Sequence, residues 1–216
     1  MNTIVIDLEF AEIYNPSFRK ICKNEIIQIG AVKLDSDNNI VGRFDSFVRP
    51  MYSKINKKVF RLTGITDSMV ERAAVFDEVF TSFLDWIGDD TYTIISWSEE
   101  DLKVIIGECN LRGFFDYRIE SMILNWEDLQ ADVGNILGVS QHLSLEKVLK
   151  ATNMELKGTA HRALDDAENT ARIYVLTTNK EETKRVLGSL VELFMPKEDL
   201  SFSMGSLFDG FECKTA

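Results

Sequence analysis

The first part of the chain consists of short runs in which apolar and polar residues alternate, a pattern that predicts β-strands. Five segments carry this pattern or a compact apolar run: 3–10, 25–34, 40–50, 92–97 and 116–124. The sequence DSDNN at 35–39 separates the second segment from the third. Such a cluster of Asp, Asn and Ser is typical of a turn, so we expect these two strands to form an antiparallel hairpin.

Most of the remaining chain shows apolar residues at the i, i+3, i+4, i+7 spacing of amphipathic helices. The clearest case is 76–88, FDEVFTSFLDWIG, in which the closing glycine ends the helix. We predict short helical pieces at 56–65 and 66–73, and longer helices at 99–110, 127–137, 144–152, 161–178 and 181–194. A hairpin followed by strand–helix alternation predicts an α/β fold with a central mixed five-stranded sheet flanked by helices.

At 216 residues the chain fits one globular domain with a sizeable core. We expect this domain to span 1–180, a C-terminal helix at 181–196 to pack on it, and 197–216 to form a tail without apolar periodicity. No apolar run approaches the ~20 residues of a membrane helix, so we expect no membrane partner. The three cysteines are widely spaced and form no CxxC pair, which predicts a reducing, cytoplasmic environment.

The net charge is −11, from 35 acidic and 24 basic residues. Binding along the length of a nucleic acid depends on many Lys and Arg contacts to phosphates, so the composition argues against it. A site that holds only the end of a strand through metal ions stays compatible with this charge. One local group is basic, Lys54, Lys57, Lys58 and Arg61, and it is either a phosphate contact or a solvated helix face.

Two acidic residues interrupt the first apolar strand, in the sequence IVIDLEF at 4–10. Side chains alternate faces along a strand, so Asp7 and Glu9 point the same way, about 6–7 Å apart. The apolar side chains then share the other face: Ile4, Ile6 and Leu8. Two like charges on one face repel each other, and a divalent cation is the strongest candidate for balancing them. A strand end that exposes both acids to water would satisfy the same pattern.

A second acidic group, Glu99, Glu100 and Asp101, begins the helix that follows the strand at 92–97. Ser98 and Asp101 stand three apart, which is typical of a capping box, and acidic residues favour a helix N-terminus in any case. The same helix leaves the carboxyl end of a strand, where the active sites of open α/β sheets gather. Both interpretations of Asp101 stay open on these residues.

The helix predicted at 161–178 carries two adjacent aspartates, which its alanine-rich apolar stripe distinguishes. At about 100° per residue, Asp166 falls on the shoulder of the stripe and faces the sheet, whereas Asp165 lies nearly opposite and should be solvated. His161 precedes Asp166 by five positions, about 140° around a continuous helix. The two residues can share one centre only if His161 lies in the preceding turn or at the helix start.

Taken together and in this order, the motifs resemble those of the DEDDh 3′→5′ exonucleases, a DnaQ-like family with a ribonuclease H-like fold. The resemblance rests on Asp7-x-Glu9, on Asp101 four residues after Trp97, and on His161 with Asp166 five residues later. It is strengthened by two further matching segments, LTGIT at 62–66 and EIIQIGAVKL at 25–34, and covers 2–178. The segments DLEF, TGIT and SWSEEDLK look most like the branch with KapD-like and RNA 3′-end-trimming enzymes.

This resemblance implies a two-metal phosphodiester hydrolase that releases nucleoside monophosphates from the 3′ end of single-stranded RNA or DNA. Two divalent cations, Mg²⁺ or Mn²⁺, suit oxygen ligands, and the implied ligands are Asp7, Glu9, Asp101 and Asp166. His161 would be the general base that takes the proton of the attacking water, a role that suits imidazole near neutral pH. The terminal nucleotide would lie against Phe10, Leu62, Thr63 and Gly64, although LTGIT also fits a simple helix-end turn.

Two other functions fit parts of the sequence. A catalytically silent module of the same fold would bind nucleic acid or a replication or RNA-processing partner, but such a module is expected to lack one of the acids, and all four are present. An aspartyl-phosphate enzyme with Asp7 as nucleophile would leave His161 and Asp166 unexplained. In the tail, Leu207 and Phe208 either bind a protein partner or, as we favour, cover an apolar patch on this domain.

Overall fold

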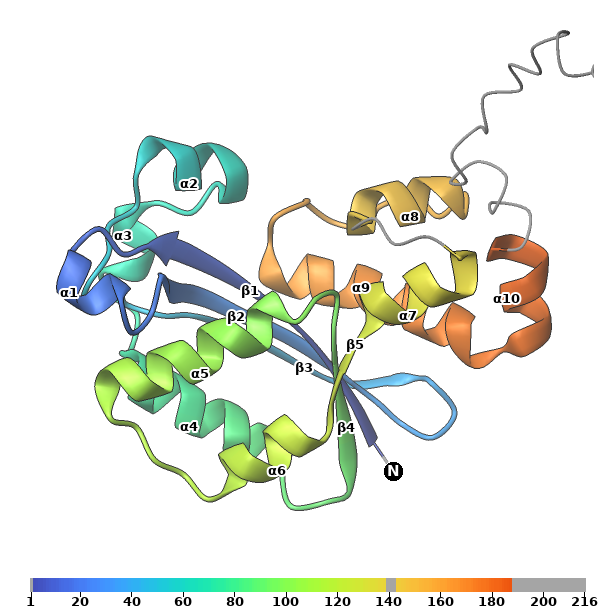
Figure 1. The fold of residues 1–216 in the computed structure, drawn as a ribbon, viewed down its shortest axis with the longest axis horizontal. Helices are drawn as coiled ribbons and strands as arrows, with labels where there is room; N and C mark the ends of the chain where they lie inside the picture. The colour runs from blue at the N-terminus through green and yellow to red at the C-terminus, as the bar shows by residue number, and fades with distance from the viewer. Residues whose placement is uncertain (1, 139–142, 188–216) are drawn as a thin grey trace, which may run out of the picture.

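The computed structural model describes residues 2–138 and 143–187, and its centre is a twisted five-stranded sheet (Figure 1). The strands are β1 (Asn2–Glu12), β2 (Asn24–Leu34), β3 (Ile40–Phe47), β4 (Tyr92–Ser96) and β5 (Trp126–Asp128), in the order β3-β2-β1-β4-β5. β1, β2 and β3 are antiparallel neighbours, whereas β4 and β5 run parallel to β1. This arrangement confirms the predicted mixed sheet and the predicted hairpin.

The helices follow the predicted segments closely at most positions. They are α1 (Pro16–Arg19), α2 (Lys57–Thr63), α3 (Asp67–Val70), α4 (Phe76–Ile87), α5 (Glu100–Arg112), α6 (Arg118–Leu124), α7 (Leu129–Leu137), α8 (Leu145–Ala151), α9 (Ala163–Thr178) and α10 (Lys180–Leu187). Within the described residues, no helix is long and apolar enough to cross a membrane.

The prediction of a strand at 116–124 is wrong, because this segment contains α6 and the fifth strand is β5, which follows it. The carboxylate of Asp116 accepts a hydrogen bond from the Arg118 backbone N–H at 2.9 Å and so starts the helical turn. Ile119 and Met122, three residues apart, then pack on the core, which is helical spacing rather than strand alternation.

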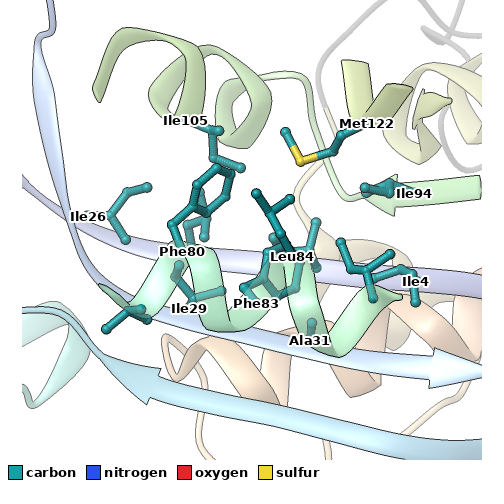
Figure 2. Packing of buried hydrophobic residues seen from close by; sticks show 14 of the residues in the cluster. Ile4, Ile26, Ile29, Ala31, Phe80, Phe83, Leu84, Ile94, Ile105 and Met122 are labelled. Carbon is teal, nitrogen blue, oxygen red and sulfur yellow. The ribbon is translucent and has the colours of Figure 1, made fainter. Parts of the chain in front are cut away.

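One apolar layer lies between the sheet and helices α4, α5 and α6 (Figure 1). α4 contributes a row of phenylalanines, of which Phe80 and Phe83 are fully buried together with Leu84 of the same helix. Figure 2 shows them against Ile4 and Ile29 of the sheet. Ile6 and Leu8 belong to the same cluster, so the apolar face of β1 is as predicted and its acidic residues face the other way.

A second apolar layer covers the opposite face of the sheet with α7, α8, α9 and α10. α10 belongs to this layer, because Leu187 is fully buried in it and the Thr183 hydroxyl donates to the Leu176 carbonyl of α9 at 2.8 Å. The described α10 thus packs on the sheet's second apolar layer. Its expected end at 194–196 and the expected tail at 197–216 lie outside the described residues.

A buried ion network joins β2, α5 and the segment between β3 and α2. The Glu25 carboxylate accepts the three consecutive backbone N–H groups of 51–53, at 2.6–2.8 Å. The Arg112 guanidinium donates to Glu25 at 2.8 Å and to Glu108 at 2.9 Å, and all three side chains are almost fully buried. One guanidinium therefore pairs with two carboxylates. Burial raises the pKa of Glu108 to about 8. The network fixes the chain that leads into α2.

We expect Arg112→Met to lower the free energy of unfolding by about 3–5 kcal/mol, because it leaves two buried carboxylates without their cation. Arg43→Met is the matched control, since Arg43 pairs with Glu168 at a largely exposed position and exposed pairs contribute about 1 kcal/mol or less. Urea unfolding followed by circular dichroism measures both variants. Equal losses in the two variants would contradict the assigned role of the network.

Candidate active site

The acidic residues of β1 form the floor of the candidate site, on the sheet face that α9 covers. In the sheet, Asp7 lies beside Gly30 of β2 and Glu9 lies beside Gln28. Asp7 is half-buried and Glu9 is only 7% exposed, so the alternative of two acids exposed to water at a strand end does not hold. Directly after Glu9 the pairing of β1 with β2 shifts by one residue, a bulge of the kind that often lies beside active sites.

Asp101 reaches the same centre from the first turn of α5. Its carboxylate accepts a hydrogen bond from the backbone N–H of Leu8 at 3.1 Å, and the residue is 6% exposed. The Ser98 hydroxyl accepts instead from the N–H of Glu100, at 3.4 Å. The capping-box alternative is therefore wrong, because the Asp101 side chain is directed at β1 and away from its own helix end.

His161 and Asp166 meet at the start of α9. His161 lies before the helix with a positive φ of 61°, and its backbone N–H donates to the Asp166 carboxylate at 2.8 Å. Nitrogen or oxygen atoms of Glu9, His161 and Asp166 all lie within 4.8 Å of one another. This is the geometry that the five-residue spacing requires for a shared centre, with the histidine in the turn before the helix.

Asp165 differs from its prediction, because it is half-buried rather than solvated. Its carboxylate accepts from the Thr159 N–H at 2.8 Å and lies where a Cβ on Gly158 would be, 2.2 Å from the Asp165 Cγ. The chain before α9 folds back over the side of the helix that helical phase alone assigns to solvent. Asp165 therefore holds this turn in place, whereas Asp166 faces the acidic residues of the sheet.

Gly30 is a residue of the site that sequence reasoning missed. A Cβ at this position would lie 2.1 Å from the Ala163 carbonyl carbon and from the Leu164 nitrogen. Only glycine lets the first turn of α9 approach the sheet this closely, and the approach occurs beside Asp7. A glycine in the middle of a strand is the sequence signal that marks such a contact.

Gln28 and Arg162 are two further neighbours of the site that the motifs did not reveal. Gln28 is buried beside Glu9, donates to Asp45 at 2.7 Å, and its side-chain oxygen has no hydrogen-bond partner. The Arg162 guanidinium lies over the Phe47 ring, 5.8 Å from its centroid. Arg162 is thus a cation at the edge of a strongly acidic centre.

The negative charges of Asp7 and Glu9 lie on one face of β1, and the pKa of each carboxyl group is raised. Burial, followed by the charges of Asp101, Asp166 and Glu9, raises the pKa of Asp7 well above its usual range. Burial also raises the pKa of Glu9 to about 8, together with the charges of Asp166 and Asp101, while Arg162 acts in the opposite direction.

The other two carboxylates are perturbed in the same direction. Burial raises the pKa of Asp101 to about 7, although the hydrogen bond from Leu8 favours its charged form. Burial raises the pKa of Asp166, although the hydrogen bond from the His161 N–H acts in the opposite direction. In all four carboxylates burial is thus the first cause of the raised pKa.

The donor set fits a divalent cation. Four carboxylates supply only oxygen atoms, which is the ligand chemistry of hard cations such as Mg²⁺ and Mn²⁺. Burial raises the pKa of each of them, and a bound divalent cation would favour their charged forms. Asp7, Glu9, Asp101 and Asp166 are therefore the residues that could hold metal here.

The residues expected at the terminal nucleotide lie at two places near the end of β1. Phe10 is half-buried on β1 directly after the bulge, and Leu62 is 51% exposed on α2. Gly64 ends α2 in the left-handed conformation, with a φ of 67°. The Thr63 hydroxyl donates to Val59 and accepts from Ile65, both at 3.0 Å. The helix-end interpretation of LTGIT is thus correct, and Leu62 is exposed beside this turn.

The chain belongs to the exonuclease family RNase_T, whose model matches residues 4–174. Its relatives and the fold make it a 3′→5′ exonuclease of the DEDDh type.

Two curated relatives carry the resemblance in sequence. The probable 3′-5′ exonuclease KapD of Bacillus subtilis is 27% identical over 83% of this chain and 85% of KapD. The 3′-5′ exoribonuclease 1 of Rattus norvegicus is 28% identical over 70% of this chain, which spans 46% of that protein. The latter match therefore concerns only part of the rat protein.

Among solved structures, the nuclease domain of 3′hExo bound to rAMP is similar, with a TM-score of 0.72 and 27% identity. The similarity covers 84% of this chain and 94% of that domain, which is described as a DEDDh family member. The resemblance found in the motifs is thus confirmed for the family and for the fold.

We expect Gly30→Ala to reduce exonuclease activity at least tenfold, because the new methyl group must push the start of α9, and with it Asp166, away from β1. A displacement of about 1 Å at a catalytic centre costs about 10²-fold in rate. Gly42→Ala is the matched control: it lies in the same hairpin, and its Cβ would meet its nearest neighbour, Trp86, at 3.4 Å. Steady-state rates and melting temperatures of both variants are the measurement. Wild-type activity in Gly30→Ala would contradict the close-approach argument.

Proposed function

We propose that this protein uses two divalent cations, Mg²⁺ or Mn²⁺, to release nucleoside monophosphates one at a time from the 3′ end of single-stranded RNA or DNA. The observation that carries the proposal is the convergence of four carboxylates from three separate elements. Asp7 and Glu9 come from β1, Asp101 from α5 and Asp166 from α9. Two divalent cations, when bound, would balance their charge and act on the attacking water and on the leaving 3′ oxygen.

In this proposal the four carboxylates hold the cations, and Asp7, at the centre of the group, is shared between them. The charges of all three other carboxylates act on Asp7, which is consistent with that central place. Hydrogen bonds from the backbone N–H groups of Leu8 and His161 fix the carboxylates of Asp101 and Asp166. These bonds orient ligand oxygens before any substrate arrives.

His161 is proposed as the general base. His161 is exposed, whereas the carboxylates are buried or half-buried, and its backbone N–H is hydrogen-bonded to Asp166. An exposed imidazole beside the acidic centre can take a proton from the attacking water and pass it to solvent. The strained φ of 61° supports a functional position, since such conformations concentrate at active sites.

The free 3′ end is proposed to lie against Phe10 and against Leu62, Thr63 and Gly64 at the end of α2. The bulge after Glu9 and the left-handed Gly64 mark these two places in the backbone. Because such contacts address the sugar and phosphate of the last nucleotide, they do not read its base. A catalytically silent module is the weaker alternative, since all four acids and the histidine lie together.

The test uses 5′-labelled single strands of RNA and DNA with one sequence, each with Mg²⁺, Mn²⁺ or a chelator. We expect a ladder of products shortened from the 3′ end in either metal and none in chelator. Asp166→Asn should abolish cleavage, whereas Asp165→Asn, which keeps an acceptor for the Thr159 N–H, should retain most of it. His161→Ala should lower the rate on the order of 10²–10⁴-fold without abolishing metal binding.

Circular and 3′-phosphorylated strands are the controls for attack at a free 3′ hydroxyl, and both should resist cleavage. Rapid cutting of a circular strand would contradict the proposal and indicate an endonuclease. Substantial activity in a folded Asp166→Asn variant would refute the assignment of the metal ligands.

A further inference from the structure

A group of basic side chains lies on and directly before α2, in a chain that is otherwise strongly acidic. Lys54, Lys57, Lys58 and Arg61 are all exposed. Among the described residues, none of the four forms an ion pair with a carboxylate. The chain has a net charge of −11, so four unpaired cations within eight residues form a local basic surface. Such a surface attracts anionic ligands.

α2 lies on the same face of β1 as the carboxylates, one step further along the strand. Ala11 follows Glu9 by two residues, which is about 7 Å in a strand, and it packs with Val59 of α2 and with Ile65. Phe47, whose ring lies under the Arg162 guanidinium, packs on the same cluster. Figure 1 accordingly shows α2 beyond the carboxyl end of β1.

The helical phase of α2 gives its basic side chains a definite direction. The buried side of the helix is defined by Val59 and Thr63. Leu62 is on one flank of that side, and Lys58, four residues earlier, lies next to Leu62 on the helix surface. Arg61 points most directly away from the buried side. A ligand that begins at Leu62 therefore meets Lys58 first and Arg61 next.

The position of α2 is fixed at its start. The Asn56 side chain accepts from the N–H groups of Lys58 and Val59, at 2.8 and 2.9 Å, and donates to the Tyr14 hydroxyl at 2.7 Å. The preceding segment 51–53 is held by the Glu25 carboxylate. The cations thus stand on a helix that is anchored relative to β1.

We propose that Lys58 and Arg61 bind the backbone phosphates of the nucleotides that precede the 3′-terminal one, so that the single strand leaves the active site along the Leu62 side of α2. The proposal rests on the proposed function, which places the terminal nucleotide at Leu62 and Gly64. The occupant is a nucleic-acid strand because its phosphates form a row of negative charges that complements a row of cations. Contacts to phosphate carry no sequence information, so the surface makes the enzyme sensitive to strand length rather than to base sequence.

The experiment measures binding of a fluorescein-labelled 12-nucleotide single-stranded DNA by anisotropy, in chelator and over a range of salt concentrations. The double variant Lys58→Gln/Arg61→Gln should weaken binding roughly tenfold at low salt, and the slope of log K against log salt should fall by about 1.4, or about 0.7 for each lost phosphate contact. Arg185→Gln, at an exposed arginine of α10 that pairs with Glu182, is the control for loss of a surface cation elsewhere and should bind as wild type. Phe60→Ala, on the opposite flank of α2, should do the same.

A second readout compares kcat/KM for the 12-mer with kcat/KM for a p-nitrophenyl ester of a nucleoside 5′-monophosphate, which occupies only the terminal position. The double variant should lower this ratio about tenfold. Binding and salt slope equal to wild type would overturn the proposal, as would an equal loss on both substrates or equal competition by polyglutamate. If the wild type cleaves neither substrate but binds the 12-mer through Lys58 and Arg61, the proposed exonuclease function is contradicted and the proposed strand-binding surface is supported.

Discussion

The loss of hydration at four carboxylates that meet at one centre is the constraint around which the rest of this structure is arranged. Burial and their neighbours raise the pKa values of all four. The protein brings them together nevertheless, because each lies on an element whose position is set by the sheet or by packing on it. β1 is central in the sheet, α5 follows β4, and α9 packs across β1 and β2. The packing of the apolar layers holds the acids together, and a divalent cation is the counter-charge that we propose for them.

The sequence was sufficient to predict the parts of the fold that depend on local pattern. The alternation in β1 placed Asp7 and Glu9 on one face and Ile4 on the other, and the periodicity of α4 identified the phenylalanines of the core. The spacing of His161 and Asp166 required the histidine to precede the helix, and the structure has it there. The structure also brings these residues together with Asp101, as the family resemblance implies.

Features that depend on contacts between distant segments could not be predicted in this way. Asp165 lies opposite the apolar stripe of α9, yet the chain before the helix folds back onto it, so helical phase gave the wrong environment. The role of Gly30 appears only when the start of α9 is placed against β2. Residues 116–124 were mistaken for a strand because a seven-residue helix with two core contacts carries too little periodicity to be distinguished from alternation.

Thermal unfolding at pH 6 and pH 8.5, in chelator and with Mn²⁺, tests most directly whether the burial of these carboxylates governs the site. A carboxylate whose pKa is raised by folding stabilises the native state while protonated, and this contribution is lost as pH rises through the folded pKa. With Glu9 near 8 and Asp101 near 7, the melting temperature in chelator should be lower at pH 8.5. Mn²⁺ should remove the part of the difference that the site carboxylates contribute, Asp7→Asn should reduce that part in chelator, and the part that Glu108 contributes should remain. A melting temperature that is independent of pH and of Mn²⁺ in the wild type would contradict the account.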